Sequence, residues 1–252
     1  MKATLKEIKN KAYPSDVFND VIPGVRFMNT VYRKLSVYFT WLFLRIDFSA
    51  NRVTILGIIV LFISCLLFLN GADYFLIASL LLLLSNVLDY SDGRVAKYTN
   101  TGSKYGAFLD GVSGVLLPSS SLISIGVGLY RTGGDLFTNV LVEEINIINV
   151  LIPDIFVFLG FMGAVSWLFR ASIDFYYLIC CCENREISEK LFLGNGLNKS
   201  IFKIGNLIGA FLVPLILIGS IFNTLSLVLI FYSFTSIFYT TLKTVRYILK
   251  GL

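Results

Sequence analysis

The sequence predicts an all-α integral membrane protein with six transmembrane helices, preceded by an amphipathic helix on the cytosolic membrane surface. Of its 252 residues, 56% are hydrophobic, and the mean hydropathy is +0.78. Only 15% of the residues are charged, whereas a soluble domain carries about 25%. The apolar residues also come in long runs rather than in periodic stripes. These three observations indicate a protein that folds in lipid.

Each expected span is an apolar run close to the roughly 20 residues that cross the hydrocarbon core as a helix. The six runs cover residues 52–70, 74–91, 106–129, 148–179, 201–220 and 223–245. The connections near Asn70–Asp73 and Ile221–Asn223 are very short, so they predict tight helical hairpins. The long fourth run can tilt or extend into the cytosol. We expect one domain over residues 1–252, with a cytosolic segment at 1–50 and the bundle at 51–252.

Residues 27–49 mix aromatic side chains with Arg33, Lys34 and Arg45. This pattern is typical of a helix that lies in the membrane interface. A seventh span is the alternative, but these charges and Asp47 leave too short an apolar core.

The positive charges predict the orientation of the bundle. Lys and Arg give the chain a net charge of +5 and concentrate in the N-terminal segment, the second and fourth connections and the C-terminus. The opposite side holds little beyond Arg131, beside Asp135, Glu143 and Glu144. By the positive-inside rule, both termini lie on the cytosolic side of a plasma or inner membrane. Because no basic surface with interleaved aromatic residues appears, we expect no nucleic-acid partner.

The sequence contains four Cys and no His. Cys65 lies in an apolar run, and Cys180, Cys181 and Cys182 are consecutive at a span end. Three adjacent Cys cannot all face one metal, so a zinc site is not expected. Free thiols near a reducing cytosol and lipidation of the cluster both remain open.

Three carboxylates flank the polar connection between the second and third runs. Asp89 and Asp92 are three residues apart, so they share one helical face. Asp110 lies about one turn into the next helix, with Gly106 one turn before it. If the two helices pack as a hairpin, the three carboxylates converge near the cytosolic membrane boundary.

Carboxylates at that depth are costly unless they are paired or bound to metal. Divalent Mg²⁺ or Mn²⁺, as one or two ions, would resolve their repulsion and grip substrate phosphates. Gly93, Ala96 and Gly106 remove side-chain bulk where a ligand could approach. The alternative is a solvated connection with Asp92-Gly93 as a helix end and Asp110 in a salt bridge.

The spacing of these residues resembles the signature of the CDP-alcohol phosphotransferase family, D-x2-D-G-x2-A-R-x8-G-x3-D-x3-D. Every spacing of the signature is kept, at Asp89, Asp92, Gly93, Ala96, Lys97, Gly106, Asp110 and Gly114. A second segment, Ala50-Asn51-Arg52-Val53-Thr54, is similar to the Pro-Asn-x-x-Thr-like start of the family's first span.

The resemblance implies a homodimer of six-span chains that uses a CDP-linked alcohol donor and a hydroxyl acceptor. The acceptor attacks the β-phosphorus of the donor, and CMP leaves. The resemblance makes Asp89, Asp92 and Asp110 metal ligands and Lys97 a phosphate contact. The family's small residues, here Gly93, Ala96 and Gly106, would let the nucleotide approach, and Asn51 and Thr54 are further candidates for the same pocket.

The chain departs from the signature at two positions. Lys97 stands where the family has Arg, which keeps the charge but loses the two-pronged hydrogen-bonding geometry. Gly114 stands where the family has a fourth Asp that helps to bind a second metal and deprotonates the acceptor. The proton can then pass to a metal-bound hydroxide or the substrate, another residue can reach in, or the chain binds CDP-alcohol without turnover.

Arg170 and Asp174 form an ionisable pair four residues apart near the end of the fourth run. Arg170 is a candidate for binding the acceptor or a phosphate, and an ion pair within the helix is the alternative.

The sequence as a whole therefore predicts a metal-dependent transferase in phospholipid or polar head-group biosynthesis, with at least one lipid-like substrate. Decoration of a surface glycan and a silent CDP-alcohol-binding subunit are the alternatives. A transporter is disfavoured, because its site would lie near the mid-membrane rather than at one interface.

Overall fold

The computed structural model describes residues 5, 7–8, 23–139, 152–181 and 197–251. Within these residues all regular structure is helical, with no strand, which confirms the all-α prediction. The principal elements are α2 (Pro23–Arg45), α3 (Ala50–Leu69), the 3₁₀ turn η2 (Ala72–Tyr74), α4 (Phe75–Thr99), α5 (Lys104–Thr132), α7 (Ile152–Cys181), α9 (Leu197–Ile221) and α10 (Leu225–Gly251).

Five stretches of helix are long and apolar enough to cross a membrane. They are Ala50–Leu69, Ala72–Thr99, Lys104–Thr132, Asp154–Ile173 and Leu225–Ile248. The remaining expected span, 201–220, falls on α9. The apolar part of α9 that the structure describes, Gly205–Ile221, is shorter than the five candidate spans. The chain is therefore an integral membrane protein by the length and composition of its helices.

The boundaries of α2 and α4 differ from the predicted ones, for local reasons. α2 begins at Pro23 rather than at residue 27, because the fixed φ of proline suits the first position of a helix. It ends before Asp47, whose φ of 51° turns the chain. α4 continues well past residue 91 and ends at Asn100, which takes the left-handed conformation with φ 54°. The first half of the acidic motif is therefore entirely helical.

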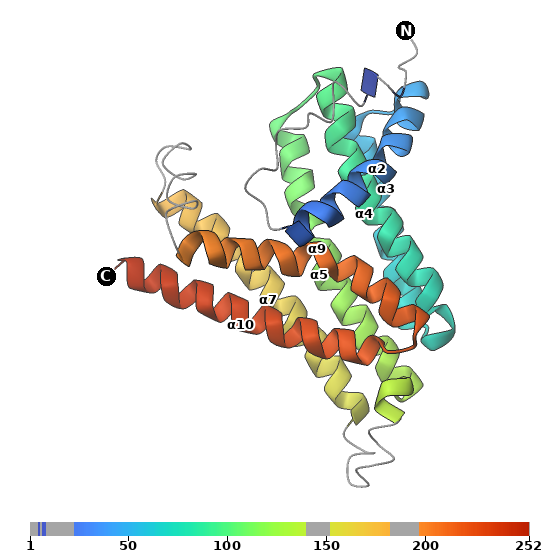
Figure 1. Ribbon diagram of the computed structural model, residues 1–252, viewed down its shortest axis with the longest axis vertical. Helices are drawn as coiled ribbons and strands as arrows, with labels where there is room; N and C mark the ends of the chain where they lie inside the picture. Colours follow the sequence, from blue (N-terminus) through green and yellow to red (C-terminus); the bar gives the residue numbers. More distant parts are fainter. Residues whose placement is uncertain (1–4, 6, 9–22, 140–151, 182–196, 252) are drawn as a thin grey trace.

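α3 is the element that organises the first half of the bundle. It packs extensively along both α4 and α5, whereas α4 and α5 touch each other at few places (Figure 1). The second and third spans therefore do not pack along each other as a hairpin, which was the condition under which the sequence brought the three carboxylates together. Each packs instead against α3, and only a short connection joins their ends at residues 100–103.

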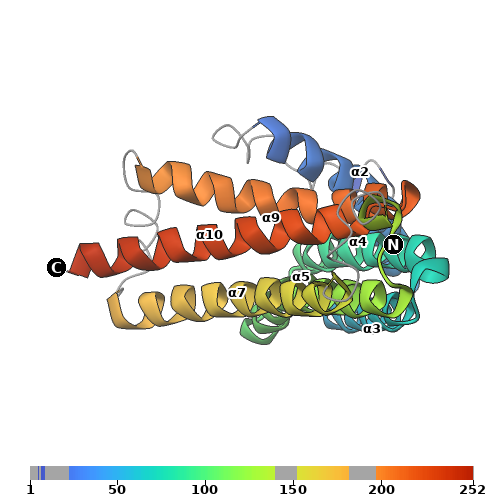
Figure 2. The ribbon, with the colours of Figure 1, turned by 90° about the horizontal axis from the view of Figure 1, so that it is seen from below.

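The second half of the bundle joins the first through α5 and α9. α5 packs along α7, where Gly126 and Gly160 let the two helices approach closely. α7 and α9 both pack against α10, and α9 also contacts α2 and α4. Figure 2 shows α7, α9 and α10 running alongside one another. Leu61, Leu82 and Leu122 from the first half and Leu212 and Tyr232 from the second share one buried core.

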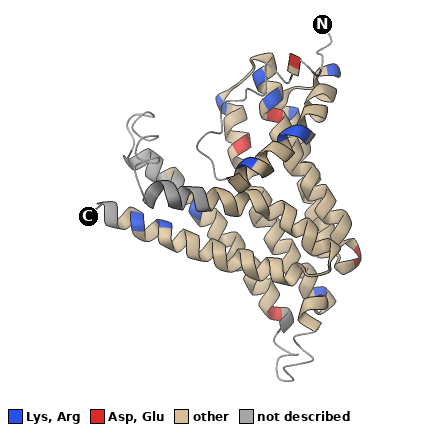
Figure 3. Cartoon of the chain, in the orientation of Figure 1, with Lys and Arg blue, Asp and Glu red and all other residues tan. Residues whose placement is uncertain are grey.

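Charged residues are distributed unequally along the bundle. Lys and Arg gather where α2, the end of α4 and the start of α5 lie, and again near the end of α10 (Figure 3).

At the opposite end of the bundle, Asp135 is only 3% exposed. Its carboxylate accepts hydrogen bonds from the backbone N–H of Ser226 at 2.7 Å and from the Ser226 hydroxyl at 2.6 Å. This contact fixes the start of α10 to the segment that follows α5.

Several residues of the sequence analysis lie outside the described part of the chain. Glu143, Glu144 and Cys182 are among the residues that the structure does not describe. For Cys180, Cys181 and Asp174 it describes only the backbone. Cys65 is buried as a free thiol.

Candidate active site

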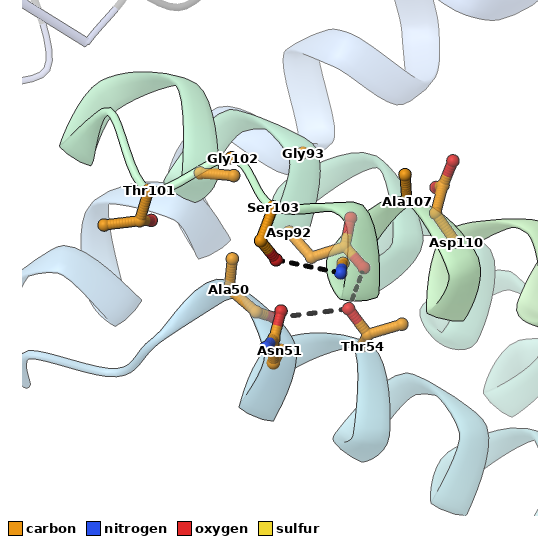
Figure 4. A pocket seen from close by; sticks show the side chains of 12 residues that line it. Ala50, Asn51, Thr54, Asp92, Gly93, Thr101, Gly102, Ser103, Ala107 and Asp110 are labelled. Atoms are coloured by element: carbon orange, nitrogen blue, oxygen red, sulfur yellow. Dashed lines mark hydrogen bonds between the residues drawn. The ribbon is translucent and has the colours of Figure 1, made fainter.

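A pocket of about 230 Å³ lies where the first turn of α3, the end of α4 and the start of α5 meet. Most of the residues that the sequence predicted for the site line this pocket: Asn51, Thr54, Asp92, Gly93, Ala96, Gly106 and Asp110. Ala50, Thr101, Gly102, Ser103 and Ala107 complete the lining (Figure 4).

The sequence builds the rim of the pocket through a helix cap. Ser103 has an extended backbone, and its hydroxyl accepts a hydrogen bond from the N–H of Gly106 at 3.0 Å. This N-cap starts α5 at Lys104 and satisfies one of the N–H groups that the first turn leaves unpaired. Together with the left-handed turn at Asn100, it brings the first turn of α5 over the pocket.

Asp92 lies on the floor of the pocket and is only 4% exposed. The Thr54 hydroxyl, from α3, donates to Asp92 Oδ2 at 2.5 Å (Figure 4). Burying a carboxylate is costly without a hydrogen bond, and this bond offsets part of that cost. It also fixes the direction of the carboxylate. The structure thus brings together two predicted site residues from different helices.

Asp89 lies about one helical turn deeper along α4 and does not line the pocket. The Ser113 hydroxyl, from α5, donates to Asp89 Oδ1 at 2.5 Å. Ser113 is 8% exposed and was not foreseen as a site residue. Its only sequence signal is its position one turn beyond Asp110, on the same face of the helix.

Asp110 is exposed and lines the pocket from α5. In Figure 4 its side chain stands at the rim, away from the floor that Asp92 and Thr54 form. The three carboxylates are near enough to interact electrostatically, Asp89 with Asp110 and Asp92 with both. Mutual repulsion of this kind favours a bound cation.

The donor set of the site fits a hard divalent cation, because it consists of carboxylate and hydroxyl oxygens. The Thr54 hydroxyl bonds to one oxygen of Asp92 and the Ser113 hydroxyl to one oxygen of Asp89, and the backbone N–H of Gly93 also interacts with the Asp92 carboxylate. Within the described residues, no three His, Cys, Asp or Glu side chains already surround one point as a bound ion would require. An ion would therefore draw these side chains inward from their present positions.

The space beside the backbone differs among Gly93, Gly106 and Gly114. A Cβ at Gly93 or Gly114 would meet no atom within 4 Å, and a Cβ at Gly106 would lie 3.3 Å from Asn51 Oδ1. At position 114, where the family has its fourth Asp, the space is open. Lys97 is exposed on the last turns of α4 and is not part of the pocket lining.

A second cavity of about 290 Å³ adjoins the first. The two share Ala50, Asn51 and Thr101, and the second extends to Asp47 and Phe48 in the turn between α2 and α3. Ala50, Asn51 and Thr101 therefore lie between the two cavities.

Arg170 lies on α7 and does not line either cavity. Its guanidinium stacks over the rings of Trp167 and Tyr239, at 4.9 Å and 4.6 Å from their centroids. The ammonium of Lys243 lies 5.9 Å from the centroid of the same tyrosine ring. The positive charges of α7 and α10 therefore share an aromatic environment separate from the acidic pocket.

The comparisons with known proteins agree with the motif. Residues 48–235 match the family model described as CDP-alcohol phosphatidyltransferase. None of the curated proteins compared with the chain matches it. Because the matched region covers most of the chain and contains the whole site, the chain belongs to the CDP-alcohol phosphatidyltransferase family, and the resemblance seen in the sequence is confirmed.

Proposed function

We propose that this family member transfers a phosphoalcohol or phosphatidyl group from a CDP-linked donor to a hydroxyl acceptor, with release of CMP, at the pocket between α3, α4 and α5. The observation that carries the proposal is the lining of that pocket. Asp92 and Asp110 come to it from two different helices, and Asn51 and Thr54 come from a third.

Asp89, Asp92 and Asp110 are proposed to hold Mg²⁺ or Mn²⁺. When bound, a divalent ion supplies positive charge that neutralises the donor's pyrophosphate and the charge that develops on the leaving CMP. The metal dependence is our inference from the oxygen donors and from the electrostatic interaction of the three carboxylates.

The chain's own residues position the donor. The missing side chain at Gly93 gives the pyrophosphate room beside α4, Ala96 adds little bulk, and Gly106 brings α5 close to Asn51. Lys97 is near the end of α4, where its flexible side chain can reach a phosphate of a bound donor. The adjoining cavity offers volume for the rest of the nucleotide.

The acceptor oxygen then forms a bond to the β-phosphorus as the bond from that phosphorus to CMP breaks, and CMP keeps the electron pair. The acceptor must also lose a proton. Position 114 offers no side chain to take it and is open, so we propose that the proton passes to the substrate or to solvent. Removing a positioned base typically costs about 10²–10⁴ in rate, which slows a transferase without silencing it.

We propose that the site faces the cytosol of a plasma or inner membrane. Lys and Arg gather at the end of the bundle that carries the acids (Figure 3), in accord with the positive-inside rule. α2 fits a helix on that membrane surface, because it buries Tyr32 and Phe43 while Phe27, Tyr38 and Leu42 stay exposed. Such a site suits at least one lipid-like substrate, and we place the enzyme in phospholipid or polar head-group biosynthesis.

Three further expectations complete the proposal. We propose that six spans are present, with α9 as the fifth, and that the chain works as a homodimer. Arg170 is the proposed contact for an anionic group of the acceptor, because an arginine held over two aromatic rings presents a partly desolvated, fixed charge.

The test is metal-dependent release of CMP. Purified protein is incubated with Mg²⁺, CDP-diacylglycerol or a water-soluble CDP-alcohol, and a panel of hydroxyl acceptors that includes glycans. CMP formation that requires both metal and acceptor is expected, and the productive acceptor separates head-group synthesis from glycan decoration. Binding of CDP-alcohol without CMP release from any pair would contradict turnover and identify a silent binding subunit.

A further inference from the structure

Among the described residues of α5, only Ser113 has a side chain that donates a hydrogen bond to a motif acid of α4. We propose that Ser113 is a positioning residue of the metal site, whose hydroxyl holds Asp89 in the orientation that binds the divalent cation. The inference rests on the proposed function, and it adds a residue that lies outside the family signature.

The bond itself is short and well protected. Ser113 Oγ lies 2.5 Å from Asp89 Oδ1, and the serine is 8% exposed. The same oxygen lies 2.9 Å from the backbone carbonyl of Asp110. A hydroxyl has one proton to donate, and a charged acceptor at shorter range makes the stronger bond. The proton therefore goes to Asp89.

The location of the bond explains its importance. α4 and α5 carry the two halves of the motif, yet they contact each other at few places because both pack on α3. A hydrogen bond between Asp89 and Ser113 ties the two helices together at the level of the acids. Without it, Asp89 loses the hydrogen bond that fixes its direction.

The arrangement repeats on the other acid of α4. Asp92 is held by Thr54 from α3 in the same way that Asp89 is held by Ser113 from α5. Each bond is made to one oxygen of the carboxylate, Oδ2 of Asp92 and Oδ1 of Asp89. Ser113 also directly precedes Gly114. It therefore supplies a hydroxyl oxygen on the turn of α5 where the family signature has its fourth Asp.

Hydrogen bonds to a metal-binding carboxylate orient it, and their removal typically lowers metal affinity by about 10–100-fold. We expect this loss of Mn²⁺ affinity in Ser113→Ala, measured by electron paramagnetic resonance on purified protein without substrate. Ser113→Thr, which keeps the hydroxyl, is expected to bind Mn²⁺ close to the wild-type affinity. Ser113→Val has nearly the shape of the threonine variant but no hydroxyl, and it is expected to bind as weakly as the alanine variant.

Ser119→Ala is the matched control. Ser119 is also buried on α5, and its hydroxyl donates to the backbone carbonyl of Val115 at 2.6 Å rather than to an acid. Its replacement is expected to leave Mn²⁺ affinity unchanged. Melting temperatures of all variants are recorded, so that the comparison of Thr with Val stands even if the alanine variant unfolds.

The outcomes separate the two proposals. Wild-type protein that binds no Mn²⁺ refutes the metal site and with it the proposed function. If the wild-type protein binds Mn²⁺ through Asp92, but Ser113→Val and Ser113→Thr bind Mn²⁺ with equal affinity, only the positioning role of Ser113 is refuted. An equal loss in Ser119→Ala also refutes that role, since the effect would then come from a general loosening of α5.

Discussion

Replacing Thr54 by Val tests the most buried contact of the site. Valine has nearly the shape of threonine, so the change leaves no cavity between α3 and α4 and removes only the hydroxyl. The change removes the hydroxyl that donates to Asp92 Oδ2 at 2.5 Å. Thr54 is 5% exposed and Asp92 4% exposed, so water has little access to replace the lost donor.

The magnitude follows from the type of bond. Hydrogen bonds to charged groups contribute about 1.5–3 kcal/mol, and about 1.4 kcal/mol corresponds to a tenfold change in affinity. We therefore expect Thr54→Val to weaken Mg²⁺-dependent binding of CDP by about 10–100-fold.

The assay is isothermal titration of CDP into purified protein with saturating Mg²⁺, repeated with EDTA in place of the metal. Thr54→Ser keeps the hydroxyl and is the control; it should bind close to the wild type. If Thr54→Val binds CDP as tightly as the wild type does, the hydroxyl does not orient a functional carboxylate and the reasoning fails.

Four further predictions follow from the site and its surroundings. Asp110→Asn should abolish metal-dependent CMP release without lowering the melting temperature, since Asp110 is exposed; turnover at the wild-type rate would remove its metal assignment. Gly114→Asp should fold, because the position is open, and should change the pH–rate profile; an unaltered profile would count against position 114 facing the acceptor. EDTA should stop CMP release, and Mg²⁺ or Mn²⁺ should restore it; activity that survives chelation would exclude metal dependence. Asp135→Ala removes the acceptor of two bonds from Ser226 and should destabilise the fold by about 2–4 kcal/mol while CDP affinity stays unchanged; a selective loss of CDP binding would contradict its structural role.

Long apolar runs and motif spacing made the fold class and the family predictable from the sequence. The runs are a direct consequence of lipid as solvent, and Asp89, Asp92 and Asp110 keep the spacing of the first three acids of the signature. The end of α4 was less predictable. Apolar character fades near residue 91, but the helix continues until Asn100 takes a left-handed conformation, so hydropathy alone marks the membrane boundary rather than the helix end.

The lateral packing of the helices could not be read from their order. Consecutive spans with a short connection suggest a hairpin, yet α5 packs on α3 far more than on α4. This arrangement makes Asn51 and Thr54 part of the acidic pocket, where they face the acids of α4 and α5.

The hydrogen bonds between hydroxyl groups and the acids also could not be predicted from the sequence. Ser and Thr are frequent in this chain, and many of them bond only to their own helix backbone, as Ser119 and Ser120 do. In the sequence, Ser113 differs from these residues only by its position one turn beyond Asp110. Only the approach of α5 to Asp89 shows that its hydroxyl has a different partner.

The most direct test of the account is anomalous diffraction from crystals grown with Mn²⁺ and CDP. We predict a manganese peak within about 2–2.5 Å of carboxylate oxygens of Asp92 and Asp110, with the pyrophosphate bound against the same peak and Gly106. A nucleotide bound elsewhere, or bound in this pocket with no manganese beside the acids, would contradict the central claim.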